Sequence, residues 1–175
     1  RDLRMSRGLG DVYKRQNSSI SYVGGILGVL SSSTMRNCSV NNIEVNLYCD
    51  NSLGIGGLVG QGNRSLIENS YVNNLKFNIN NLKITRIGGI IGYDGYGLEI
   101  KNTYTQGEIK SNTNIIGGII GLINGSRIYN NYSNVNIDTT GEYLGGIAGY
   151  YGGNKPELKN NLVLGNIYTC LLYTS

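Results

Sequence analysis

Residues 54–72 read GIGGLVGQGNRSLIENSYV, and this stretch contains two short motifs that recur through the chain. The first motif is an aliphatic residue, a Gly-Gly pair, two aliphatic or small residues and a third Gly. It occurs five times, as VGGILG from Val23, IGGLVG from Ile55, IGGIIG from Ile87 and again from Ile116, and LGGIAG from Leu144. The Gly-Gly pairs begin at residues 24, 56, 88, 117 and 145, so successive copies lie 32, 32, 29 and 28 residues apart. Such periods are typical of repeat architectures.

The second motif is centred on an Asn that lies 13 to 15 residues after the start of each Gly-Gly pair. Its five copies are MRNCS, IENSY, IKNTY, IYNNY and LKNNL, with the Asn at positions 37, 69, 102, 130 and 160. A looser run of alternating apolar residues follows, so each repeat offers three short stretches of strand character and no amphipathic helix. These features predict an all-β fold, a right-handed parallel β-helix of about five coils of 28–32 residues. A β-sandwich or meander does not explain why the same residue types recur at the same offsets.

Stacked coils assign structural roles to the recurring residues. The five Asn side chains are predicted to form a ladder in which each amide donates to the next, satisfying buried polar groups at a corner. The motif glycines are predicted to allow positive φ or close backbone approach at a tight corner. A phosphate-binding loop is not indicated, because no GK[ST] follows any copy and no helix follows a strand.

Tyrosines also recur at fixed positions. Tyr71, Tyr104 and Tyr132 occupy one column, with Ser39 and Leu162 at its ends, and predict a stacked aromatic column in or beside the core. The alternative is a platform that binds glycans. Four further tyrosines follow the Gly motifs in looser loops and are better candidates for exposed stacking surface, although plain packing is the favoured interpretation: Tyr93, Tyr96, Tyr150 and Tyr151.

Composition excludes several functions. The 175 residues include no His, so imidazole bases, Ser-His-Asp systems and HExxH zinc sites are absent. The net charge is +4, but the first 16 residues carry five basic and two acidic side chains, which leaves the rest nearly neutral. Scattered Lys and Arg do not form the basic stripe that nucleic acid requires. The longest apolar stretch, Ile115 to Ile123, is too short to span a bilayer, so no membrane insertion is predicted.

Both ends of the sequence differ in residue composition from the repeats between them. Residues 1–16 and the closing CLLYTS, residues 170–175, resemble translated adaptor sequence at the ends of assembled metagenomic reading frames. We therefore expect both to be non-native and residues 17–169 to be a fragment of a larger repeat protein. The alternative for residues 1–16 is a genuine basic arm. Because neither end of the repeat array resembles a polar capping repeat, head-to-tail self-association of the isolated fragment is expected.

No catalytic, cofactor-binding or metal-binding residue is predicted. Glu68 falls in a column that carries Arg36, Lys101, Tyr129 and Lys159 in the other repeats, and such mixed charge indicates an outward face. No carboxylate pair on adjacent repeats is evident, which argues against glycan cleavage. No Asp recurs after the Gly-Gly pair, as calcium-binding repeats require. Cys38 stands in a column of small polar residues, and a Cys38–Cys49 disulfide fits the spacing but is not favoured.

The elements GIGGLVG (residues 54–60) and IENSYV (residues 67–72), with their four relatives, resemble the GLUG motif, a short bacterial repeat. The resemblance covers residues 22 to about 167 and departs mainly in the first and last copies, where Cys38-Ser39 and Asn161-Leu162 replace Ser-Tyr. GLUG repeats occur in large secreted or surface proteins, including the non-catalytic N-terminal part of streptococcal immunoglobulin A-specific metallopeptidases. The resemblance implies an extracellular, cell-wall or cell-surface location and brings no catalytic residue.

The sequence is compatible with three functions. The first is a non-catalytic spacer or adhesin-like surface that binds a host protein or a glycan. The second is the substrate-positioning part of a surface metallopeptidase whose active site lies outside this chain. The third, ranked lowest, is a glycan-cleaving β-helix.

Overall fold

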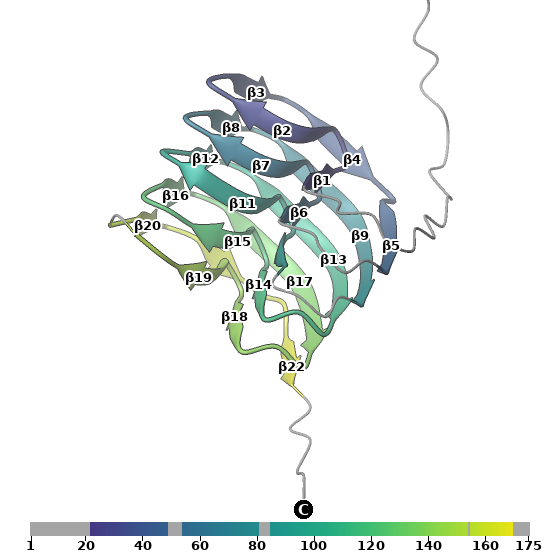
Figure 1. Ribbon diagram of the computed structural model, residues 1–175. Helices are drawn as coiled ribbons and strands as arrows, with labels where there is room; N and C mark the ends of the chain where they lie inside the picture. Colours follow the sequence, from purple (N-terminus) through teal and green to yellow (C-terminus); the bar gives the residue numbers. More distant parts are fainter. Residues whose placement is uncertain (1–21, 49–53, 81–84, 154, 170–175) are drawn as a thin grey trace, which may run out of the picture.

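The structure is a computed structural model that describes residues 22–48, 54–80, 85–153 and 155–169. Every regular element in these ranges is a β-strand, and every strand pairing is parallel. The strands stack as a parallel β-helix in which each repeat forms one coil (Figure 1). The predicted fold class is therefore confirmed, and the expected non-native segments 1–16 and 170–175 lie outside the described residues.

Four sheets make up the walls of the solenoid. Sheet A contains β1 (Tyr22–Gly24), β6 (Gly54–Gly56), β10 (Arg86–Gly88), β14 (Ile115–Gly117) and β18 (Tyr143–Gly145). Sheet B contains β2 (Leu27–Ser31), β7 (Val59–Asn63), β11 (Ile91–Tyr96), β15 (Ile120–Ile123) and β19 (Ala148–Tyr151). Sheet C contains β3 (Thr34–Arg36), β8 (Leu66–Glu68), β12 (Glu99–Lys101), β16 (Arg127–Tyr129) and β20 (Glu157–Lys159). Sheet D contains β4 (Ser39–Asn41), β5 (Glu44–Tyr48), β9 (Tyr71–Asn80), β13 (Tyr104–Ser111), β17 (Tyr132–Thr139), β21 (Leu162–Val163) and β22 (Ile167–Thr169).

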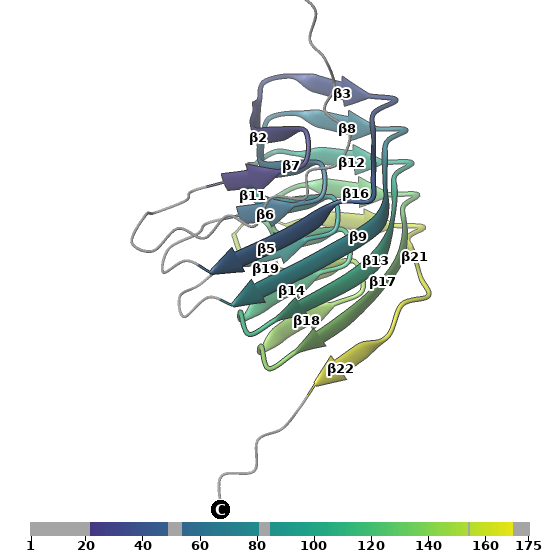
Figure 2. The same cartoon turned by 90° about the vertical axis from the view of Figure 1, so that its right-hand side faces the viewer.

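The three middle coils have four strands each where three were expected, and the first and last coils have five because their sheet D segment is divided in two. The difference lies in the Gly-rich motif, whose Gly-Gly pair ends a sheet A strand and turns the chain sharply into sheet B. Sheets A, B and C each hold five strands, so the five rungs are separated by four steps of ~4.8 Å along the solenoid axis. Figures 1 and 2 show the chain winding in a right-handed sense, with the long strands of sheet D forming one broad wall.

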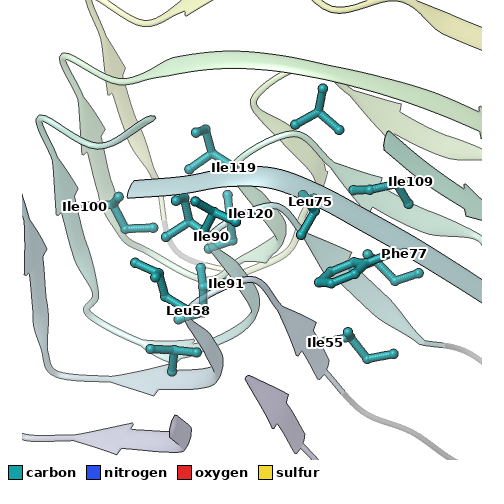
Figure 3. Close-up of a cluster of buried hydrophobic side chains, with 14 of the residues drawn as sticks. Ile55, Leu58, Leu75, Phe77, Ile90, Ile91, Ile100, Ile109, Ile119 and Ile120 are labelled. Atoms are coloured by element: carbon teal, nitrogen blue, oxygen red, sulfur yellow. The ribbon is translucent and has the colours of Figure 1, made fainter. Parts of the chain in front are cut away.

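Aliphatic side chains one repeat apart fill the interior in register. Three of the columns are Val23-Ile55-Ile87-Ile116-Leu144, Met35-Ile67-Ile100-Ile128-Leu158 and Val45-Phe77-Ile109-Ile137-Ile167. In the three middle coils these side chains are inaccessible to solvent (Figure 3). Burial of this kind is worth roughly 1.5–3 kcal/mol per side chain, which no single coil could obtain alone.

The motif glycines are explained by close approach, one of the two predicted reasons. A Cβ on Gly56 would lie 2.1 Å from the carbonyl oxygen of Val59, and one on Gly57 would lie 2.2 Å from that of Gly89 in the next coil. A Cβ on Gly57 would also lie 2.8 Å from Val72 across the interior. The Gly-Gly turn therefore packs against backbone within its own coil and in the next one. None of these motif glycines adopts a positive φ.

The motif asparagines have a different role from the one predicted. All five adopt a positive φ between 49° and 57°, and all are exposed. They mark the bend from sheet C to sheet D, where Asn tolerates the left-handed conformation better than most residues. Two inter-coil amide bonds do form, from Asn102 to Asn69 and from Asn160 to Asn130, each at 3.3 Å, but on the surface. The prediction of a buried Asn ladder is therefore wrong.

The polar ladder that does enter the interior lies one residue later. Its members are Cys38, Ser70, Thr103, Asn131 and Asn161. The backbone N–H of Cys38 donates to Ser70 Oγ at 3.1 Å, and that of Thr103 donates to Asn131 Oδ1 at 3.0 Å. Cys38 is a free thiol and fits the small polar column in which it was placed, whereas Cys49 lies outside the described residues.

Candidate interaction surface

The outward face of sheet D is the broadest regular surface of the solenoid (Figure 2). Burial alternates along β9, where Val72 is buried and its neighbour Tyr71 is half-exposed. Because neighbouring strands are in register, the outward side chains align in columns that run from coil to coil. The four columns are Ser39-Tyr71-Tyr104-Tyr132-Leu162, Asn41-Asn73 with Gln106-Asn134, Glu44-Lys76-Glu108-Asn136, and Asn46-Asn78-Lys110-Asp138-Tyr168.

The tyrosine column has the predicted register, with Ser39 and Leu162 at its ends. The rings of Tyr71 and Tyr104 are stacked, with centroids 4.9 Å apart and planes 6° from parallel. They lie on the outer face and not within the core. Each ring therefore has one face covered by the other, which leaves the pair less open ring face than two unstacked tyrosines would offer to a sugar.

Amide side chains bridge neighbouring coils on the same face. Asn74 Nδ2 donates to Asn42 Oδ1 at 2.7 Å, and Asn78 Nδ2 donates to Asn46 Oδ1 at 2.8 Å. In each pair the partners are 32 residues apart, one full repeat. These bonds hold the surface amides at fixed positions, which lowers the entropy that a ligand must remove when it binds.

A groove of about 470 Å³ opens beside the C-terminal ends of the sheet D strands. Residues of β5, β9, β13 and β17 and of the turns after them line it, among them Asn46, Asn78, Lys110 and Asp138. These four residues form one outward column, one from each of four successive coils. Lys110 Nζ pairs with Glu108 at 2.9 Å, and the pairing raises the pKa of Lys110.

Sheet C carries the mixed-charge column on its outer face, as predicted. Arg36 pairs with Glu68, and Lys101 Nζ lies 3.1 Å from Glu68 Oε2 and 3.3 Å from Glu99 Oε1. The network continues through Arg127 to Glu157 and Lys159. Opposite charges therefore alternate along the solenoid axis and cancel one another locally.

Sequence reasoning missed one juxtaposition in this network. Glu68 and Glu99 come from adjacent coils and share the Lys101 ammonium, although no adjacent carboxylate pair was expected. Glu99 lies two residues before Lys101 on β12, and the pairing of β12 with β8 aligns Lys101 with Glu68. Together these two relations bring both carboxylates near Lys101, and they were the signal available in the sequence. The bonds from Arg36 and Lys101 hold the pKa of Glu68 below its usual value, and the Tyr129 hydroxyl, 2.5 Å away, does the same for Glu99. Both carboxylates are therefore ionised at neutral pH, whereas a glycosidase needs one raised pKa for its general acid.

The loop-associated tyrosines lie on the outer side of sheet B. Tyr96, Tyr150 and Tyr151 are each between 41% and 48% exposed, in agreement with their assignment as exposed stacking candidates. Tyr93 is half-buried, and the Arg86 guanidinium lies over its ring, 4.7 Å from the centroid. These tyrosines do not belong to the outward columns of sheet D.

Asp94 is a buried acid that the sequence did not single out. It pairs with Gly62 in the column that begins with Leu30, and its side chain is inaccessible to solvent. Its Oδ2 accepts hydrogen bonds from the N–H of Asn124, at 2.7 Å, and from the Ser126 hydroxyl. Burial raises the pKa of this carboxyl group. The contacts fasten one coil to the next and make Asp94 a structural residue.

No protein-family model, curated protein or solved structure matches this chain. Among the described residues, no helix is long and apolar enough to cross a membrane.

Proposed function

We propose that this chain is a non-catalytic repeat segment of a bacterial secreted or cell-surface protein, in which a rigid β-helix carries an adhesin-like interaction surface. The observation that carries the proposal is the outward face of sheet D, where polar and aromatic side chains align in four columns across successive coils. A flat, ordered and repetitive face of this kind suits an extended partner, either a host protein or a glycan. The resemblance to GLUG repeats supports the extracellular location.

The charged outer face of sheet C supports a non-catalytic role. Its carboxylates are paired along sheet C, and the pKa values of Glu68, Glu99 and Glu157 are lowered by their hydrogen-bond partners. None of the three is thereby suited to donate a proton at neutral pH. A metallopeptidase that uses this segment to position substrate remains the alternative, and it requires an HExxH sequence elsewhere in the full reading frame.

Binding to immobilised extracellular-matrix proteins and to glycans tests the proposal. We expect the double variant Gln106→Ala/Asn134→Ala, which alters the outward face of sheet D, to weaken binding. The matched variant Arg127→Ala on sheet C should bind as well as the parent chain. Equal binding by all three proteins would show that the outward face of sheet D is not the binding surface. New reducing ends or unsaturated products on incubation with polysaccharides would show instead that the chain cleaves glycans.

A further inference from the structure

The groove at the C-terminal ends of the sheet D strands combines features that select a class of ligand. Its volume of about 470 Å³ lies within the range of small-molecule sites. Along its central column, the Asn46 and Asn78 amides both donate and accept hydrogen bonds, the Lys110 ammonium only donates, and the Asp138 carboxylate only accepts. The column therefore carries one positive and one negative charge and has no net charge.

This chemistry matches hydroxyl groups better than it matches charged or apolar ligands. A hydroxyl both donates and accepts, so neighbouring hydroxyls of one molecule can satisfy an amide, an ammonium and a carboxylate in turn. A polyanion would meet Asp138 and also Glu108, whose carboxylate pairs with Lys110 at 2.9 Å, and a polycation would meet the exposed Lys110 ammonium. An apolar ligand would strip water from the ammonium and the carboxylate without replacing their hydrogen bonds.

The geometry of the column also indicates the direction in which a ligand would lie. Its members come from four successive coils, so they are spaced at the ~4.8 Å interval of paired strands along the solenoid axis. Ser111 and Thr139 also line the groove, and each is tied to a nearby turn: Ser111 Oγ bonds to Thr113 Oγ1 at 3.0 Å, and Thr139 Oγ1 accepts from Gly141 N–H at 2.9 Å. These bonds keep the wall in place before a ligand arrives.

We infer that this groove binds a neutral oligosaccharide or polysaccharide, which lies along the solenoid axis and is recognised through its hydroxyl groups by Asn46, Asn78, Lys110 and Asp138. The inference rests on the proposed function, because it specifies the partner of the sheet D face. It places recognition at the polar groove and not at the mutually stacked Tyr71 and Tyr104.

Affinity electrophoresis and calorimetry with the full chain test this site. The neutral probes are cello-, xylo-, manno- and galacto-oligosaccharides with their parent polymers, and the charged probes are polygalacturonate and heparin. We expect at least one neutral probe to bind, and Asn78→Ala/Asp138→Ala to weaken that binding by about tenfold or more, because two hydrogen-bonding groups are lost. Lys159→Ala is the matched control, since Lys159 is exposed on sheet C, outside the sheet D face, and does not line the groove. Its affinity should equal that of the parent chain.

Unchanged thermal unfolding of the double variant shows that a loss of affinity is local. If only charged probes bind, or if the double variant binds a neutral probe normally, the inference is overturned. If a host protein binds through Gln106 and Asn134 while no neutral glycan binds, the glycan inference fails and the proposed function stands. If neither glycan nor matrix protein binds the parent chain, both fail.

Discussion

Asn69 and Asn102 occupy the same corner in adjacent coils with nearly identical backbone conformations, φ of 49° and 52°, and their amides are joined by a 3.3 Å hydrogen bond. Both are exposed, so the amide bond contributes little beyond what water could supply. The backbone conformation is the feature that the sequence motif conserves within this chain from coil to coil.

Asn69→Gly and Asn69→Leu separate these two contributions. Gly adopts positive φ readily, so Asn69→Gly should change the free energy of unfolding only slightly. Leu should lower it by about 1–2 kcal/mol, because a side chain with a Cβ and no local hydrogen bond is strained in the left-handed region. Chemical denaturation of both variants gives the comparison. Equal destabilisation by Gly and Leu would show that the amide ladder stabilises the corner after all.

Two buried threonines in β13 and just before it provide a matched pair. In the described part of the chain, the Thr105 hydroxyl has no hydrogen-bond partner, and its column holds Val in three other coils. Thr103 Oγ1, by contrast, donates to Asn131 Oδ1 at 2.9 Å. We expect Thr105→Val to raise the free energy of unfolding by roughly 1 kcal/mol and Thr103→Val to lower it by a similar amount. Destabilisation by Thr105→Val would mean that its hydroxyl is satisfied in solution.

The buried Asp94 predicts a specific dependence of stability on pH. Because burial raises its pKa in the folded state, the fold favours the protonated form, and the contribution of Asp94 is greatest below its unfolded pKa of ~3.9. That contribution declines as the pH rises through the folded pKa. Asn at this position keeps an oxygen for Asn124 N–H and Ser126 but does not titrate.

Asp94→Asn should therefore gain stability relative to the parent chain between pH 4 and pH 7. Urea denaturation of both proteins across this range measures the difference. A difference in unfolding free energy that stays constant with pH would contradict a raised pKa at Asp94.

Sequence periodicity predicted the stacking, the identity of the repeats, the tyrosine register and the outward mixed-charge column. It misplaced the buried polar ladder by one residue, because Asn at a left-handed corner and Asn in an amide ladder recur in the same way. Sequence periodicity also counted the sheet A and sheet B strands of each repeat as one strand. The sheet A strand before the Gly-Gly turn has only three residues, too few for an alternation of apolar and polar side chains to separate it from the next strand. The groove could not be predicted, because it depends on how far the sheet D strands extend beyond one another.

The two ends of the described solenoid expose apolar side chains. Ile26, Leu27 and Val29 are 38–49% exposed at one end, and Leu158, Leu162 and Leu164 are 46–60% exposed at the other. Leu27 and Leu158 stand at the open ends of interior columns, so a second copy can extend the stack. We expect the isolated chain to associate head-to-tail with rising concentration, which sedimentation velocity measures. A strict monomer over a hundredfold concentration range would contradict this expectation.

Residues one repeat apart stack in register along a single axis, and the distance between two spin labels can check this stacking in solution. Arg36 and Lys159 are 123 residues apart in sequence, yet they lie in the same outward column, separated by four steps. Their side chains are 58% and 65% exposed, so labels at these positions should not perturb the core. With the native cysteines replaced by serine, double electron–electron resonance should give a distance of ~20 Å, four inter-strand spacings. A distribution centred beyond about 35 Å would contradict the stacked solenoid, since four such spacings cannot span it.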